Sequence, residues 1–187
     1  MARPSRPVLL PIDMQQAFDL PGRPRRGNPA VDRNGLALLA AWRAKGWPII
    51  HVRHDSVEPD SWFRPEHPGN ALRPGFEPAG GEALVGKSVN SAFIGTDLDL
   101  RLRRLGADAV VAFGMTTDMC VSTTVRTGAN MGWPMIVVGD ACDCCDLPDP
   151  IGGGIIRAEE LQRAHLATLA AEFARLVTTA DLLAEVA

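Results

Sequence analysis

The chain has 187 residues, a formal net charge of −3 and a sequence pI of about 5.8. Hydrophobic residues make up 46% of it and charged residues 22%, a composition that indicates a folded globular protein and excludes a disordered chain. We expect a single domain over residues 1–187, long enough to bury a core without a metal or disulfide. We interpret the short basic stretch Arg23–Arg26 as a solvated loop, so no nucleic-acid partner is expected.

Membrane and disulfide features are also missing from the sequence. No segment approaches the roughly 18 apolar residues that a membrane span needs, and Pro11 and Asp13 interrupt the first apolar run, which argues against a signal peptide. Three of the four cysteines crowd together, and two of them are adjacent, which is poor geometry for disulfides. We therefore predict a cytoplasmic protein with reduced thiols and no membrane partner.

The first half of the chain begins with an apolar run that predicts a buried strand over residues 7–12. Pro11 cannot donate to a sheet ladder, so it must face a gap in pairing, or the strand must be shorter. Asn28 and Pro29 are typical of a helix start, and Gly46 is expected to end that helix. Its buried face should consist of Val31, Gly35, Leu38, Leu39 and Trp42.

The rest of the chain alternates apolar runs with helical patterns. We expect a strand over 49–53 and a long functional loop over 55–80. The remaining expected elements are a strand over 83–85, a helix capped by Thr96 with Leu98, Leu102 and Leu105 on its buried stripe, a strand over 109–113, a helix over about 118–131, a strand over 135–138, a helix over about 157–174 and a strand over 176–178. This alternation predicts a doubly wound, mostly parallel α/β sheet with helices on both faces.

Three reactive residues follow predicted strands, where the carboxyl edge of an open α/β sheet gathers its functional groups. Asp13 follows the first strand, Lys87 follows 83–85, and Cys120 lies in the first turn of the helix after 109–113. A helix N-terminus and a nearby ammonium favour a thiolate, so we expect Cys120 to deprotonate more easily than a free thiol. Asp13 could take the thiol proton and return it to a leaving amine. The turn before Cys120 could offer backbone N–H groups to an oxyanion.

Four motifs occur in a fixed order along the chain. They read Asp13-Met-Gln15 with Phe18 behind it, Lys87-Ser-Val-Asn-Ser-Ala-Phe93, Gly114-Met-Thr-Thr117-Asp-Met-Cys120-Val121, and Val137-Val-Gly-Asp140-Ala141. In this order they resemble the isochorismatase-like cysteine hydrolase family, and the resemblance runs from about residue 7 to residue 178. The turn that carries the cysteine is the most specific of the four.

The resemblance implies a catalytic triad of Asp13, Lys87 and Cys120. It also implies a cis peptide bond between Met115 and Thr116, which would direct the N–H groups of Thr116 and Cys120 at the oxyanion. Isochorismatases that cleave a vinyl ether lack this cysteine, so its presence argues for hydrolysis of an amide, ureide or carbamoyl group. Family members are usually homo-oligomers, and the same is expected here, with a small-molecule substrate and no cofactor.

The sequence offers several candidates for substrate binding. We name Gln15, Phe18, Phe93 and Trp62 as candidates, with Phe63 as a further possible pocket wall. Four arginines could each bind a substrate carboxylate, and the sequence does not choose among Arg53, Arg64, Arg73 and Arg126. Three histidines, His51, His54 and His67, are candidate zinc ligands, but their spacing does not match the metal site of the similar nicotinamidases, so we predict no metal.

Several rival signals remain. Residues 81–88 match the P-loop pattern G-x-x-x-x-G-K-[ST], and Asp140 could act as its magnesium ligand, but the segment's Ala-Leu-Val core favours a strand. Residues 152–154 are three glycines that we interpret as a flexible approach to the last helix. His165 is expected to be a packed or interface residue. We expect only incidental or supporting roles for Cys142, Cys144 and Cys145. A non-catalytic binding protein on the same fold is the alternative to an enzyme.

Overall fold

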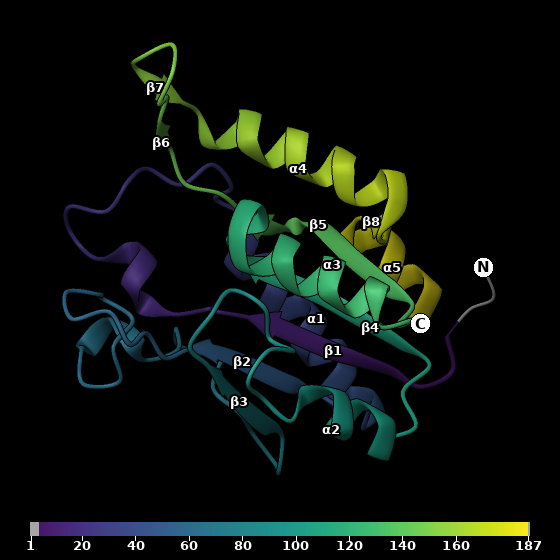
Figure 1. Cartoon of the computed structure of the whole chain (residues 1–187). Helices are drawn as coiled ribbons and strands as arrows, with labels where there is room; N and C mark the ends of the chain where they lie inside the picture. Colours follow the sequence, from purple (N-terminus) through teal and green to yellow (C-terminus); the bar gives the residue numbers. More distant parts are fainter. Residues whose placement is uncertain (1–3, 187) are drawn as a thin grey trace.

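The computed structural model describes residues 4–186, and its centre is a six-stranded parallel sheet in the order β3-β2-β1-β4-β5-β8 (Figure 1). The strands are β1 (Pro7–Ile12), β2 (Ile50–His54), β3 (Ala83–Lys87), β4 (Ala109–Met115), β5 (Met135–Asp143) and β8 (Arg175–Val177). The predicted doubly wound, mostly parallel α/β fold is therefore confirmed. The order reverses between β1 and β4, which makes their carboxyl ends the topological switch point of the sheet.

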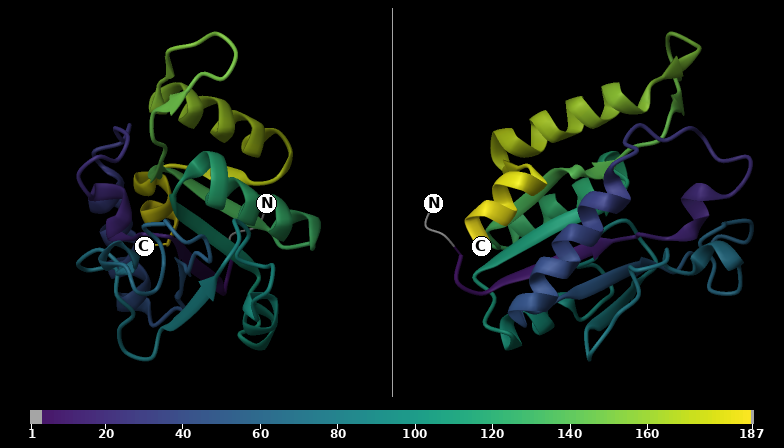
Figure 2. Two further views of the ribbon diagram at one scale, coloured as in Figure 1. Left: turned by 60° about the vertical axis from the view of Figure 1, so that its left-hand side comes forward. Right: turned by 180° about the vertical axis from the view of Figure 1, so that it is seen from behind.

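Helices cover both faces of this sheet. One face carries α1 (Val31–Lys45) and α5 (Thr179–Val186), and the other carries α2 (Leu98–Arg104), α3 (Ser122–Asn130) and α4 (Ala158–Glu172), as Figure 1 and the view from behind in Figure 2 show. Because the sheet is covered on both sides, every residue of β1 and β4 is buried. Residues 14–30 and 55–80 gather at the carboxyl ends of the strands, on the left of Figure 1.

Pro11 lies in β1 at the gap in pairing that the sequence required. The residues two positions before and after it donate their backbone N–H groups toward β2. Leu9 donates to the carbonyl of Pro48 at 3.0 Å, and Asp13 donates to the carbonyl of Val52 at 2.9 Å. Pro11 lacks the N–H for the rung between them, and it keeps its register with Phe113 of β4 on its other side. The proline is thus accommodated within a strand of full length.

The boundaries of several elements differ from the predictions for identifiable reasons. Helix α1 begins at Val31, because Oδ1 of Asn28 accepts the N–H of Ala30 in a turn that precedes the helix. Its predicted buried face is correct, and Gly46 ends it in the left-handed conformation. The predicted helix over 118–131 starts as a π turn, η3 (Thr117–Val121), and continues as α3. Leu105, expected in the buried stripe, is 42% exposed at the end of α2.

Two features were absent from the sequence-based prediction. Helix α5 follows β8, and strands β6 (Leu147–Pro148) and β7 (Ile155–Ile156) form a hairpin that encloses the glycines of residues 152–154. Residues 83–87, which matched the P-loop pattern, form strand β3 and pair with β2 from Ala83 to Lys87, so they make no phosphate-binding turn. Among the described residues, no helix is both long enough and apolar enough to cross a membrane.

Candidate active site

Four neighbouring strands each deliver one polar or reactive side chain to the same edge of the sheet. Lys87 is the last residue of β3 and pairs in register with His54, the last residue of β2. Asp13 follows β1 directly, and Cys120 lies in the turn that follows β4. Because β3, β2, β1 and β4 are adjacent in the sheet, residues separated by up to 107 positions in the sequence meet at the switch point.

The Lys87 ammonium lies at the centre of this group. Its Nζ atom donates to Oδ2 of Asp13 at 2.7 Å and lies 3.3 Å from Sγ of Cys120 and 2.9 Å from Nδ1 of His54. An ammonium carries three hydrogens and accepts none, so these contacts can use all of them. Nδ1 of His54 must then be an acceptor, which leaves the imidazole proton on Nε2.

Asp13 is held in an environment that favours its protonated form. Its backbone has a φ of 51°, a left-handed conformation that aspartate tolerates better than most residues. The side chain is 1% exposed, and Oδ1 has no hydrogen-bond partner among the described residues. Burial raises the pKa of Asp13 above its ordinary value, although the adjacent Lys87 opposes the shift. A carboxylate with a raised pKa is a stronger base, which suits proton abstraction.

The turn that carries Cys120 has an unusual backbone. The peptide bond between Met115 and Thr116 is cis, and the N–H of Val121 donates to the carbonyl of Thr116 at 3.1 Å, the bond that opens the helix as a π turn. Gly114, with a φ of 130°, is required at the end of β4, because a Cβ atom there would lie 2.0 Å from the carbonyl oxygen of Ile12. This close approach brings the cysteine turn against the end of β1.

The protonation of Cys120 is not what the sequence indicated. Burial, followed by the charge of Asp13, raises the pKa of the Cys120 thiol above its ordinary value, and Lys87 offsets this only in part. The expected lowering of the Cys120 pKa is therefore wrong. The desolvation depends on how deeply the turn is buried, which a sequence pattern does not report.

A cavity of about 220 Å³ opens onto this cluster, and Asp13, His54 and Cys120 form part of its wall. Its other lining residues include apolar and charged side chains, Phe18, Phe63, Met119, Leu147, Arg23 and Asp118. A larger groove of about 650 Å³ lies at the opposite ends of the strands, beside the first residues of β2 and β3. The smaller cavity is the candidate active site, because it contains the sulfur and the carboxylate.

The predicted substrate-binding residues divide into two groups. Phe18 lines the cavity, and Trp62 lies close to it through its contact with Arg23. Phe93 lies instead in the core against Gly128, so its expected place in the pocket wall is wrong. Gln15 does not line the cavity either: it is fully buried, and its amide bonds the backbone of His54 and Asn70. Gln15 thus positions the end of β2.

The four arginines named from the sequence do not line the cavity. Arg53 pairs with Asp55, Arg64 with Glu66, and Arg73 with Asp19 and Asp32, while Arg126 donates to the hydroxyl groups of Ser122 and Thr168. The arginine that does line it is Arg23, which belongs to the stretch interpreted as a solvated loop. That interpretation is wrong for Arg23, which is half-buried, and for Arg26, which pairs with buried Asp143.

The three histidines do not share a site. Nε2 of His51 contacts Glu82 at 2.7 Å, and His67 accepts the N–H of Gly69 while stacking on Trp62. Ligand atoms of Asp13, His54 and Cys120 do lie within 4.8 Å of one another, as a metal site would require. Lys87 contacts all three residues, however, so a cation already stands where these groups converge. The donor set therefore fits an ammonium.

The fold and this cluster define an α/β protein with a cysteine-centred site at the switch point of its sheet. The chain belongs to the isochorismatase family: the family model described as Isochorismatase domain matches residues 7–181. It is accordingly an isochorismatase-family hydrolase. The uncharacterized isochorismatase family protein YrdC of Bacillus subtilis (strain 168) is 36% identical over 176 residues, which cover 94% of each chain.

Other relatives have named activities or solved structures. A crystal structure of an isochorismatase-family protein from Chromobacterium violaceum ATCC 12472 aligns with a TM-score of 0.91 and 42% identity, over 100% of this chain and 98% of that one. A cysteine hydrolase from Pseudomonas syringae pv. phaseolicola 1448A aligns with a TM-score of 0.87 and 27% identity, over 97% and 92%. Streptothricin hydrolase of Streptomyces noursei is 32% identical over 75% of this chain and 51% of its own length. Ureidoacrylate amidohydrolase RutB of Methylobacterium radiotolerans is 27% identical over 74% and 67%.

Proposed function

We propose that this hydrolase cleaves a C–N bond of a small amide, ureide or carbamoyl compound through a covalent intermediate on Cys120. The observation that carries the proposal is the set of contacts of Lys87, which touches a buried carboxylate, an imidazole nitrogen and the sulfur at once. Two relatives, named streptothricin hydrolase and ureidoacrylate amidohydrolase, support this reaction class. The cavity volume of about 220 Å³ suits a small molecule.

In the first half of the reaction, the thiol proton of Cys120 passes to Asp13 as the sulfur attacks the substrate carbonyl. Burial raises the pKa of both groups. In the proposed resting state the thiol is neutral and Asp13 is kept ionised by its contact with the Lys87 ammonium, so the thiol proton moves during attack. The carbonyl oxygen becomes an oxyanion, which backbone N–H groups of Thr116 and Cys120 would stabilise. When the C–N bond breaks, Asp13 returns the proton to the departing nitrogen.

In the second half, water replaces the amine. Asp13, again ionised, takes a proton from the water as its oxygen attacks the thioester carbon. The C–S bond breaks, the acid product leaves, and the sulfur regains a proton. The Lys87 ammonium would stabilise the negative charge that passes between the sulfur and the carboxylate.

The test is ammonia release from a panel of small amides, ureides and carbamoyl compounds, with hydroxylamine added in a parallel series. A thioester intermediate should divide between water and hydroxylamine, so a hydroxamate should form at the expense of the acid. Cys120→Ala should form neither product. Cys142→Ala, at a fully buried cysteine outside the cavity, is the control and should keep both. Ammonia release without any hydroxamate from an active compound would argue against the covalent route.

The alternative considered from the sequence, a non-catalytic binding protein on the same fold, disagrees with the family assignment. It would require that compounds of the panel bind without ammonia release, and that substitution of Asp13 or Lys87 change affinity alone.

We also propose, from the family resemblance, that the protein is a cytoplasmic homo-oligomer. Light scattering on a size-exclusion column tests the oligomer, and a monomer at micromolar concentration would contradict it.

A further inference from the structure

The cavity contains one cation that the proposed reaction does not use. The guanidinium of Arg23 lies over three aromatic rings, 5.2 Å from the centroid of Trp62, 5.8 Å from Phe63 and 5.9 Å from Phe18. Phe18 and Phe63 are cavity walls, and so is Arg23 itself. The planar cation is therefore packed against the wall of the cavity that holds Cys120.

Among the described residues, Arg23 has no acidic partner within ion-pair distance. Its Nε atom is buried and has no hydrogen-bond partner. The two terminal nitrogens make no hydrogen bond to another described residue, and they are not among the buried atoms without a partner. The terminal nitrogens are thus accessible and unused. A guanidinium presents these two nitrogens as a planar fork that matches a carboxylate.

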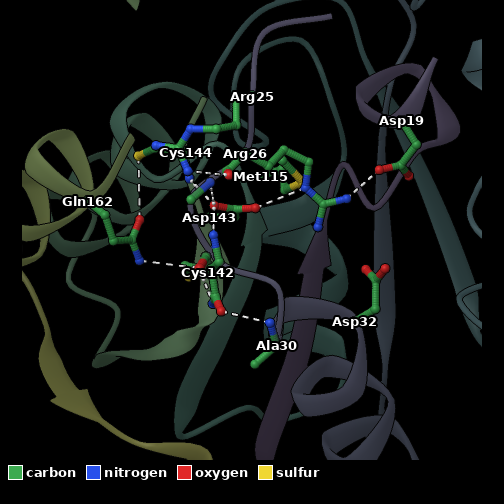
Figure 3. Close-up of polar contacts among 12 residues, drawn as sticks. Asp19, Arg25, Arg26, Ala30, Asp32, Met115, Cys142, Asp143, Cys144 and Gln162 are labelled. Carbon is green, nitrogen blue, oxygen red and sulfur yellow. Dashed lines mark hydrogen bonds and ion pairs between the residues drawn. The ribbon is translucent and has the colours of Figure 1, made fainter. Parts of the chain in front are cut away.

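The arginines beside it explain why no protein carboxylate fills this role. Arg25 pairs with Asp146 and Glu159, and Arg26 pairs with Asp143 and Asp19. Figure 3 shows Asp143 beside Arg26, at the end of β5. The four acidic side chains that contact Arg25 and Arg26 are therefore already engaged, and Arg23 has no ion pair among the described residues.

The same contacts fix the loop that carries Arg23. Oδ1 of Asp143 accepts the backbone N–H groups of Gly27 at 3.0 Å and Asn28 at 2.8 Å, and the N–H of Asp146 donates to the carbonyl of Arg25 at 2.8 Å. Asp143 is only 1% exposed, so this anchor is shielded from solvent. A guanidinium held by three rings and an anchored loop loses little freedom on binding, which favours recognition.

We propose that Arg23 binds a carboxylate of the substrate and that the protein selects small amides, ureides or carbamoyl compounds that carry one. The inference rests on the proposed function and deepens it. Asp118 lies in the same cavity wall, where Oδ1 accepts from Sγ of Cys144 at 3.3 Å, and it would repel a second anionic group. The preferred substrate therefore has one carboxylate at one end and the scissile carbonyl at the other.

The first test measures anion preference without any turnover. Iodoacetate and iodoacetamide alkylate a thiol with the same geometry but differ in charge, and peptide mapping reports the rate at Cys120 for each. The ratio of iodoacetate to iodoacetamide rates should fall at least about fivefold in Arg23→Gln and less in Arg23→Lys, which keeps the charge but loses the fork. Arg64→Gln, which removes the same charge from the loop over 55–80, should leave the ratio unchanged. Equal ratios in wild type and Arg23→Gln would overturn the proposal.

The second test uses N-carbamoyl derivatives of glycine, β-alanine and 4-aminobutyrate, each beside its neutral methyl ester. Wild type should release ammonia faster from the acid than from the ester of the best chain length. Arg23→Gln should reduce this acid-over-ester preference about ten- to a hundredfold, mainly through a higher KM for the acids. If Arg23→Gln changes acids and esters equally, Arg23 is only structural and the proposal fails.

The two tests separate this inference from the proposed function. If no compound yields ammonia but the alkylation ratio depends on Arg23, the anion site stands and the proposed reaction on these compounds fails. If the compounds are hydrolysed through Cys120 and neither ratio depends on Arg23, the reaction stands and the anion site is refuted. Melting midpoints of the Arg23 variants identify any loss caused by unfolding.

Discussion

The Nζ atom of Lys87 lies 2.9 Å from Nδ1 of His54, so the candidate site depends on the protonation of one imidazole. The ammonium can only donate, and a protonated imidazole has no acceptor to offer it. Burial, followed by the charge of Lys87, lowers the pKa of His54 below its ordinary value of 6.5. The neutral form that accepts from Lys87 is therefore the form present at neutral pH.

This contact predicts an acidic limb in the pH profile of kcat/KM. As the pH falls below 6.5 and through the lowered pKa, His54 gains a proton. Nδ1 then carries a hydrogen, can no longer accept from Lys87, and is repelled by its ammonium. The amide oxygen of His54→Asn can replace Nδ1 without ionising, so this variant should keep activity near that of wild type and should lose the acidic limb that His54 causes. An acidic limb that remains in this variant belongs to Asp13. His54→Leu should reduce kcat/KM about ten- to a hundredfold. Identical profiles in all three proteins would show that the imidazole has no part in the reaction.

The same histidine should make the folded protein less stable at acidic pH. Its pKa is lower in the folded chain, so the unfolded chain binds more protons at acidic pH. The titration of His54 should therefore not change the free energy of unfolding above about pH 6.5. Below that pH the free energy of unfolding should fall as the pH drops through the lowered pKa. Urea titrations of wild type and His54→Asn across this range measure the difference, which should grow toward acidic pH.

Asp13→Asn should separate turnover from thiol reactivity. The substitution removes the proposed base, so ammonia release should be lost. It also removes a negative charge that raises the pKa of Cys120, while Lys87 remains. Alkylation of Cys120 by iodoacetamide should consequently reach half its maximal rate at least about one pH unit lower than in wild type. An unchanged or higher midpoint would contradict the electrostatic description of the site.

Gln15→Leu should act on stability. Oε1 of Gln15 accepts the N–H of His54 at 2.8 Å, and its amide nitrogen donates to the carbonyls of Asn70 at 2.9 Å and His54 at 3.1 Å. Leucine would leave buried backbone groups unpartnered, at a cost of about 2–4 kcal/mol of unfolding free energy. Gln16→Leu, which breaks one bond of a half-buried side chain to Leu72 O, is the control and should cost about 1 kcal/mol or less. Equal losses in both variants would refute this role.

Much of the fold and the central cluster could be predicted because both depend on strand ends. A parallel sheet brings the carboxyl ends of β3, β1 and β4 to one edge, so Lys87, Asp13 and Cys120 were identifiable from their positions after apolar runs. Pro11 was also informative, because a residue without an N–H inside a buried run required the gap that the structure contains.

The rest depended on contacts that leave no periodic signal. The sequence places His54 directly after a predicted strand, which is the signal for its contact with Lys87, but the proposed reaction needs no histidine base and the pattern makes it only a candidate metal ligand. The sequence pattern predicts a solvated basic loop at Arg23, whereas the structure places this residue in the cavity wall against three aromatic rings, beside the ion-paired Arg25 and Arg26. Gln15 and Phe93 belong to motifs of the family, but a motif does not reveal whether a side chain faces a cavity or the core.

The measurement that tests the whole account most directly is the turnover of Cys120→Ala on the most active compound of the panel. Without the sulfur no acyl-enzyme can form, so kcat/KM should fall by about 10⁴-fold or more while the melting midpoint stays close to that of wild type. Turnover within a few fold of wild type, in a folded variant, would mean that Cys120 is not the nucleophile.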